Sequence, residues 1–138
     1  MELQMQYPSK EVDDYWIQER VDNDYPSHTP HGGKWLIFIK TELLDELWHK
    51  IRQSLIDGKL GSIAKTATAK PNPNAMSSKE KVTCIYSCDA DDKEDVMRIR
   101  QTLREIGITW KIPYKLDDAT RLGKYRKNGD KRISAYYE

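Results

Sequence analysis

The chain has 138 residues, and its 23 basic and 22 acidic side chains leave a net charge of +1. This length is typical of a single domain, and the balanced charge gives no overall attraction to nucleic acid or anionic lipid. No apolar run is long enough to span a membrane, and the N-terminus lacks the apolar core of a secretion signal. We therefore expect one cytoplasmic domain over residues 1–138 that does not bind membranes.

The charge is unevenly distributed, because residues 1–33 are acidic and residues 110–138 are basic. Val12, Trp16 and Glu19 recur at helical steps after a proline, which predicts an amphipathic helix over residues 9–20. A loop rich in proline and glycine should complete an N-terminal part over 1–33. A body of sheet and helices is expected to follow over 34–138.

Residues 34–40 form a compact apolar run that predicts a strand buried on both faces. Apolar residues at helical spacing then predict a helix that ends at Gly58. Residues 59–69 should form a strand of unusually small side chains. Its alternation places Ser62, Ala64, Thr66 and Thr68 on one face and Ile63, Lys65 and Ala67 on the other.

A loop is predicted over residues 70–78, followed by a strand at 82–87 and a helix capped by the aspartates of 89–92. Alternation over 108–115 predicts a strand that buries Ile108, Trp110, Ile112 and Tyr114. Asn128 and Gly129 are typical of a tight hairpin. The expected core comprises Trp35, Phe38, Leu47, Trp48, Ile51, Ile85, Val96, Ile99 and Leu103.

This element order predicts an α+β fold with a curved, mainly antiparallel sheet and two main helices on one face. Cys84 and Cys88 are expected to be free thiols, because their spacing across a strand end is awkward for a disulfide. His28 and His31 share a loop, but two histidines do not complete a closed metal site. We therefore assign no metal, cofactor or catalytic residue.

Lys65 lies in a predicted strand of small residues with Thr66 and Thr68, an arrangement suited to phosphate or carboxylate recognition. The alternative is an ordinary outward-facing strand lysine. The cations around Tyr125 could bind phosphates while the ring stacks on a base, or they could form a solvated hairpin face. The predicted ligand-binding residues are Trp35, Lys65, Thr66, Thr68, Arg121, Lys124, Tyr125 and Arg126.

Several short motifs occur in order: GKWLIFI (33–39), DELW (45–48), LGSIAKTAT (60–68), VTCIY (82–86), DVMRIR (95–100) and YKLD (114–117). Together they resemble the basophilic-leukaemia-expressed protein family over about residues 32–137. That family is similar in fold to the messenger-RNA cap-binding translation initiation factor, which implies a curved sheet with a concave ligand groove. Cap binding is not implied. In that factor two loop tryptophans sandwich the methylated guanine, but here the strand from Lys34 runs into its helix within a few residues, which leaves no room for the first, and residues 70–81 contain no tryptophan.

Three functions remain open on the sequence. The first is a non-catalytic binding module for a nucleotide or other phosphorylated small molecule, including a phage or mobile-element protein that sequesters a nucleotide signal. The second is a lyase-like enzyme with Lys65 as base and His28 or His31 as acid. The third is a protein-interaction domain that docks through Trp16. A nucleic-acid partner is not favoured, and the oligomeric state is left open.

Overall fold

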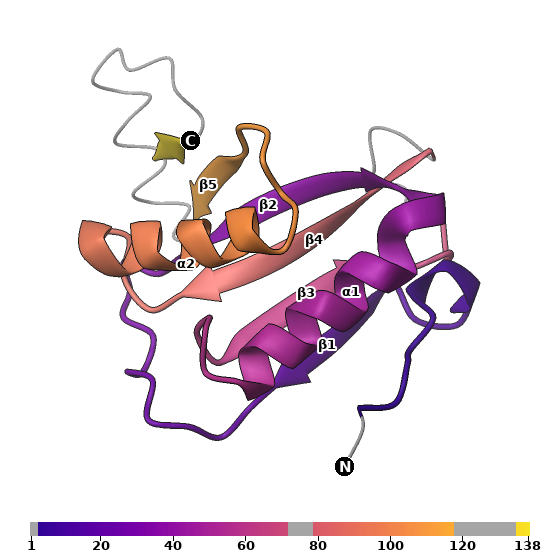
Figure 1. The fold of residues 1–138 in the computed structure, drawn as a ribbon, viewed down its shortest axis with the longest axis horizontal. Helices are drawn as coiled ribbons and strands as arrows, with labels where there is room; N and C mark the ends of the chain where they lie inside the picture. The colour runs from indigo at the N-terminus through magenta and orange to yellow at the C-terminus, as the bar shows by residue number, and fades with distance from the viewer. Residues whose placement is uncertain (1–2, 72–78, 118–134) are drawn as a thin grey trace.

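The computed structural model describes residues 3–71, 79–117 and 135–138 (Figure 1). These residues form a six-stranded sheet in the order β1-β3-β4-β2-β5-β6, with every neighbouring pair antiparallel. Both α-helices cover the same face of the curved sheet, which confirms the predicted α+β fold. The strands are β1 (Trp16–Arg20), β2 (Gly33–Lys40), β3 (Ile63–Ala67), β4 (Glu80–Ser87), β5 (Pro113–Leu116) and β6 (Tyr136–Tyr137), and the helices are α1 (Thr41–Ile56) and α2 (Lys93–Glu105).

The two helices begin and end where their sequence predicts. Asp92 caps α2 by accepting a hydrogen bond from the backbone nitrogen of Asp95 at 3.2 Å. Gly58 and Gly107 follow α1 and α2 with φ of 75° and 114°, a conformation that costs little only for glycine. The α1 and α2 boundaries thus follow from capping chemistry and apolar periodicity.

The core lies between the helices and one face of the sheet. Trp35 and Ile37 of β2 pack there with Trp48 of α1 and Ile99 of α2, and all four are fully buried. The core prediction is wrong for Phe38, whose side chain is 48% exposed. Alternate residues of β2 point to opposite faces of the sheet. Trp35 and Ile37 point to the helix-covered face, and Phe38, which follows Ile37, points to the opposite face.

The predicted N-terminal helix is wrong. Residues Pro8–Lys10 form a 3-10 turn, and residues 16–20 form the edge strand β1 on β3. The same residues also alternate, with Ile17 and Glu19 directed toward α1, where Glu19 binds Arg52. Pairing with β3 also satisfies backbone groups that would otherwise form an open sheet edge, so tertiary contacts outweigh the helical spacing.

The predicted strand over residues 108–115 is shorter than expected, because β5 begins only at Pro113. The fully buried guanidinium of Arg100 donates hydrogen bonds to the backbone oxygens of Ile108 and Trp110, at 2.9 and 2.7 Å. These carbonyls therefore bind a side chain of α2 in place of a neighbouring strand. Trp110 is exposed, contrary to the expected alternation, whereas Ile108 and Ile112 are buried.

Cys84 and Cys88 are both buried free thiols, as predicted. The hairpin expected at Asn128 and Gly129, and most of the loop expected over residues 70–78, lie outside the described residues. Among the helices of the described residues, none has both the length and the apolar character needed to cross a membrane.

Candidate ligand-binding face

The sheet register separates the side chains of each strand into two sets. Lys65 pairs with Cys84, which pairs with Leu36, so all three point away from the helices. We call this the open face, meaning the sheet face that α1 and α2 do not cover (Figure 1). Its polar and aromatic residues are Trp16, Gln18, Arg20, Lys34, Phe38, Lys40, Lys65, Glu80, Tyr86, Lys115 and Tyr137.

Lys65 occupies a central strand of the open face. Its ammonium lies 4.1 Å from the centre of the Trp16 ring on the neighbouring strand β1, a cation–π contact. The alternation predicted for this segment is confirmed, because Ile63 and Ala67 share its face while Thr66 lies opposite. Since Ile63 and Ala67 are small or apolar, Lys65 is the polar side chain that the residues of β3 present on the open face, beside Trp16, Gln18 and Arg20 of β1.

A second cation, Lys34, lies across the sheet on β2. Its ammonium forms an ion pair with Asp117 and lies 5.4 Å from the centre of the Tyr86 ring. Lys115 of β5 pairs with Lys34 in the register, so the two lysines extend from adjacent strands. Arg20 lies at the end of β1 on the same face. The open face thus presents cations on β1, β3, β2 and β5, and Tyr86 of β4 lies between the two pairs of cationic strands.

Cys84 lies between these lysines but is not suited to nucleophilic chemistry. Burial raises the pKa of its thiol to about 11, and the positive charges of Lys65 and Lys34 oppose that rise only in part. A thiol with this pKa is protonated at neutral pH. Cys84 therefore contributes to the floor of the open face as a small apolar side chain.

A depression of about 590 Å³ lies at one end of the open face, where Arg20 and Ile63 meet the loop that follows β1. His28 lines it, with its ring centroid 6.4 Å from that of Tyr25 and 6.3 Å from that of Tyr86. The other lining residues are Val21, Asp22, Asn23, Pro26, Ser27 and Ser62.

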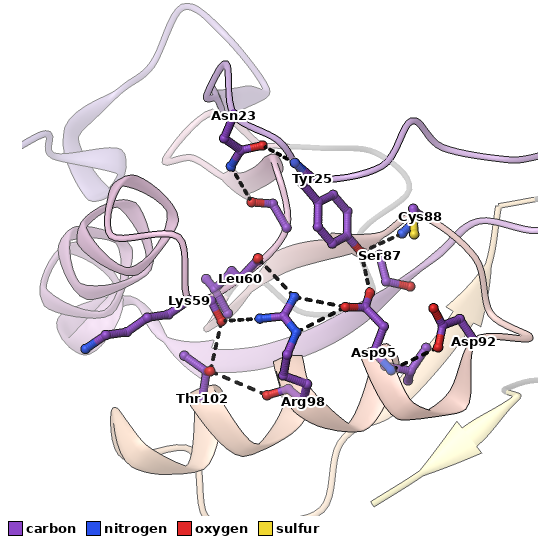
Figure 2. A network of polar contacts seen from close by, with 12 residues as sticks. Asn23, Tyr25, Lys59, Leu60, Ser87, Cys88, Asp92, Asp95, Arg98 and Thr102 are labelled. Carbon is purple, nitrogen blue, oxygen red and sulfur yellow. Dashed lines mark hydrogen bonds and ion pairs between the residues drawn. The ribbon is translucent and has the colours of Figure 1, made fainter.

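A polar network fixes the loop that carries His28 (Figure 2). The Tyr25 hydroxyl donates to Asp95 Oδ2 at 2.5 Å and accepts from the backbone nitrogen of Cys88 at 2.9 Å. Asp95 also binds Arg98, which donates to the backbone oxygens of Lys59 and Leu60. Burial and the hydrogen bond to Asp95 raise the pKa of Tyr25, so its hydroxyl remains a donor.

The structure separates the predicted ligand-binding residues. Lys65 is on the open face, but Trp35, Thr66 and Thr68 are fully buried away from it. The Trp35 indole donates to the backbone oxygen of Val96 at 3.1 Å, and the Thr66 hydroxyl lies 2.9 Å from that of Thr83. Their hydrogen-bonding groups thus contact the protein itself. Arg121, Lys124, Tyr125 and Arg126 lie outside the described residues.

Sequence reasoning missed Trp16, Arg20, Lys34, Tyr86 and Lys115 as members of this face. The alternation of residues 16–20 could have revealed the first two, had it been weighed against the helical spacing. Only the strand register brings the other three together. Among the described residues, no three His, Cys, Asp or Glu side chains gather as metal ligands would.

Solved structures of translation initiation factor eIF4E are similar in fold. The chain matches Caenorhabditis elegans eIF4E-3, in a complex with the 4E-binding protein Mextli and a cap analog, with a TM-score of 0.53, 20% identity and 78% of this chain covered. It matches a schistosome eIF4E complexed with m7GpppA and 4E-BP with a TM-score of 0.55 and 16% identity, again over 78% of this chain. The chain spans 57% and 59% of the length of these two proteins.

These likenesses establish the fold expected from the sequence resemblance. A family model gives the closer relationship, since it matches residues 28–123 and so includes β2 to β5 and both α-helices. The chain belongs to the family of the basophilic leukemia-expressed protein Bles03.

Proposed function

We propose that the open face binds a nucleotide or other phosphorylated small molecule and releases it unchanged. The observation that carries this proposal is the row of cations Arg20, Lys65, Lys34 and Lys115, interleaved with the rings of Trp16 and Tyr86. Lysines bind phosphate as point charges, and aromatic rings stack on heterocycles.

The electrostatics of the open face support an anionic ligand. Among the strand residues of this face the described carboxylate is Glu80, which pairs in the register with Lys40. Asp117 forms the ion pair with Lys34, Asp22 lines the depression, and Glu11, Asp13 and Asp14 lie beside Trp16 at the edge of the sheet. Lys65 instead has its charge over a neutral ring, and that side chain is only partly exposed. A phosphate approaching Lys65 therefore meets an ammonium that has no carboxylate in its described contact and that is partly shielded from solvent.

The similarity in fold to eIF4E, solved with a cap analog and with m7GpppA, supports a nucleotide as one such ligand. A sequestering role, such as that of a phage protein that removes a nucleotide signal, is a finer form of this proposal. It requires tight retention and release of an intact molecule.

The alternative functions make different predictions. A lyase with Lys65 as base and His28 as acid would convert its ligand, so a product would accumulate. The protein-interaction hypothesis relied on an N-terminal helix carrying Trp16, but residues 16–20 form strand β1 and Trp16 lies beneath Lys65. We therefore favour the ligand-binding role over docking through Trp16.

Native mass spectrometry with nucleoside mono-, di- and triphosphates tests the proposal, followed by calorimetric titration of the tightest binder. Lys65→Met keeps the apolar stem and removes the charge, and should weaken binding about 10- to 150-fold, equivalent to about 1.5 to 3 kcal/mol. Lys93→Met, at an exposed position of α2, is the matched control. Equal affinities of the two variants would exclude Lys65 from the site, and a changed ligand mass would indicate catalysis.

A further inference from the structure

We propose that the depression lined by His28 is a subsite for an uncharged, planar heterocycle, the base of a nucleotide whose phosphate lies over the neighbouring lysines. This inference rests on the proposed function of the open face and specifies which end of the ligand lies where. The depression has a volume of about 590 Å³, which is within the range of small-molecule sites and exceeds the space that a single base requires.

The first argument is an unsatisfied atom. His28 Nε2 is buried and has no hydrogen-bond partner among the residues that the structure describes. Buried polar atoms are nearly always paired, and this one belongs to a residue that lines the depression, so it is available to a ligand atom or an ordered water. Nε2 of a neutral imidazole donates or accepts according to its tautomer, which suits the ring nitrogens and exocyclic groups of a base.

The second argument is the charge state of His28. Burial lowers the pKa of His28 and is the largest effect. The negative charge of Asp117 raises the pKa, the positive charge of Arg20 lowers it, and the net result is a pKa below the usual value. The imidazole is therefore neutral at pH 7, and it does not attract a phosphate as a cation would. The anionic part of a ligand is left to the cations Lys34, Lys65 and Arg20, of which Arg20 also lines the depression.

The third argument is the position of Tyr86 between the two parts of the site. Its ring centroid lies 6.3 Å from that of His28 and 5.4 Å from the Lys34 ammonium. A base beside His28 and a phosphate beside Lys34 therefore flank one ring, a separation that a single nucleotide can span. Tyr25, at 6.4 Å from His28, completes an aromatic wall around the subsite.

The fourth argument is rigidity. The side-chain amide of Asn23 donates to the backbone oxygen of Gly61 at 3.3 Å and accepts from the backbone nitrogen of Tyr25 at 3.1 Å (Figure 2). The Tyr25 hydroxyl is fixed between Asp95 and Cys88. These lining groups use their hydrogen bonds to hold the loop, so the wall is preformed and His28 remains the group that reads the ligand.

Calorimetric titration with adenosine, guanosine, cytidine and uridine 5′-monophosphates, alongside ribose 5-phosphate, tests the subsite. At least one nucleotide should bind more than about tenfold tighter than ribose 5-phosphate, since stacking and a hydrogen bond each add affinity. His28→Ala should bring that ratio close to one without changing the affinity for ribose 5-phosphate. His28→Gln, which retains polar atoms, and His31→Gln, at a half-exposed position beside Asp91, are the comparison variants.

A second measurement is independent of variant stability. The imidazole nitrogen resonances of His28, assigned by their loss in His28→Gln, should shift when the preferred nucleotide is added and stay unchanged with ribose 5-phosphate. Equal affinities for ribose 5-phosphate and every nucleotide would overturn the subsite and leave the phosphate site standing. A nucleotide preference that depends on His28 but not on Lys65 would support the subsite and overturn the proposed phosphate site, and no binding by any probe would overturn both.

Discussion

The two faces of the sheet differ in how their polar groups are satisfied. On the helix-covered face the Trp35 indole donates to Val96, and the hydroxyls of Thr66 and Thr83 bind each other 2.9 Å apart. On the open face the Lys65 ammonium lies over the Trp16 ring, and His28 Nε2 has no hydrogen-bond partner in the described part of the chain. Within the described residues, Lys65 and His28 are thus groups of the open face that remain for a ligand, while the other buried nitrogen without a partner, His49 Nδ1, lies in α1.

The contrast extends to adjacent residues of one strand. Thr66 and Lys65 are neighbours in β3, yet the pleat places Thr66 in the core and Lys65 on the open face. Substitutions on one face should therefore alter folding, and those on the other should alter ligand affinity. The following predictions test this division, starting with the largest expected effect.

Truncation of Trp48 to alanine should cause the largest loss of stability. Trp48 is fully buried in α1, and its indole donates to Gln6 Oε1 at 2.8 Å. Removing such a side chain costs about 3 to 5 kcal/mol in unfolding free energy, because apolar contacts are lost and a cavity remains. Chemical denaturation monitored by circular dichroism measures this difference.

Phe38→Ala is the matched truncation on the open face. Because Phe38 is 48% exposed, its loss should cost less than about 1 kcal/mol in unfolding free energy. Similar losses in the two variants would mean that something covers Phe38, and the open face would not be open at that end of β2.

The fold was largely predictable from the sequence, because apolar periodicity and helix caps are local signals. The predictions of α1, α2, β2 and β4 all rested on such signals. The role of β1 was not predictable in this way. Its residues fit both a helical and an alternating pattern, and pairing with β3, far along the chain, decides between them.

The candidate site was less predictable, because it is assembled by strand register. Sequence reasoning found Lys65 by its unusual setting but grouped it with Thr66 and Thr68, which are buried on the other side. Trp35 was expected to stack on a ligand, yet its apolar ring lies in the core with Tyr114 at 5.3 Å. An aromatic residue in an apolar strand gives no local indication of which face it will occupy.

Thr66→Val should have an intermediate effect, on stability alone. The substitution leaves the buried Thr83 hydroxyl without its partner, which should cost about 1 to 3 kcal/mol in unfolding free energy. The double variant with Thr83→Val should recover part of that loss, since both polar groups are then absent. Ligand affinity should equal that of the unmodified protein, in contrast to Lys65→Met.

A double-mutant cycle on Thr66 and Thr83 tests whether the loss of stability comes from the hydrogen bond between the two hydroxyls. Additive losses in the two single variants would show that the hydroxyls do not interact. A loss of ligand affinity in folded Thr66→Val, at a temperature where it is fully native, would contradict the separation of the two faces.

The smallest effect should come from His28, as a dependence of stability on pH. Burial and the positive charge of Arg20 hold the pKa of folded His28 below 6.5, and Asp117 opposes them, while Tyr25 and Tyr86 are uncharged neighbours. The unfolded chain therefore binds a proton before the folded chain does. Stability is fully present above pH 6.5 and is lost as the pH falls from there through the lower pKa of the folded state.

His28→Gln removes this titration and leaves every other acidic and basic group in place. The difference in unfolding free energy between the original protein and His28→Gln should be constant from pH 8 to 7 and should shift against the original protein from pH 6.5 to 5. Denaturant titrations at each pH measure it, with His31→Gln as the control. Parallel curves would mean that His28 titrates alike in both states, and a shift in favour of the original protein on acidification would mean that Asp117 outweighs burial. The second outcome would mean that the imidazole is not the neutral group that the base subsite requires.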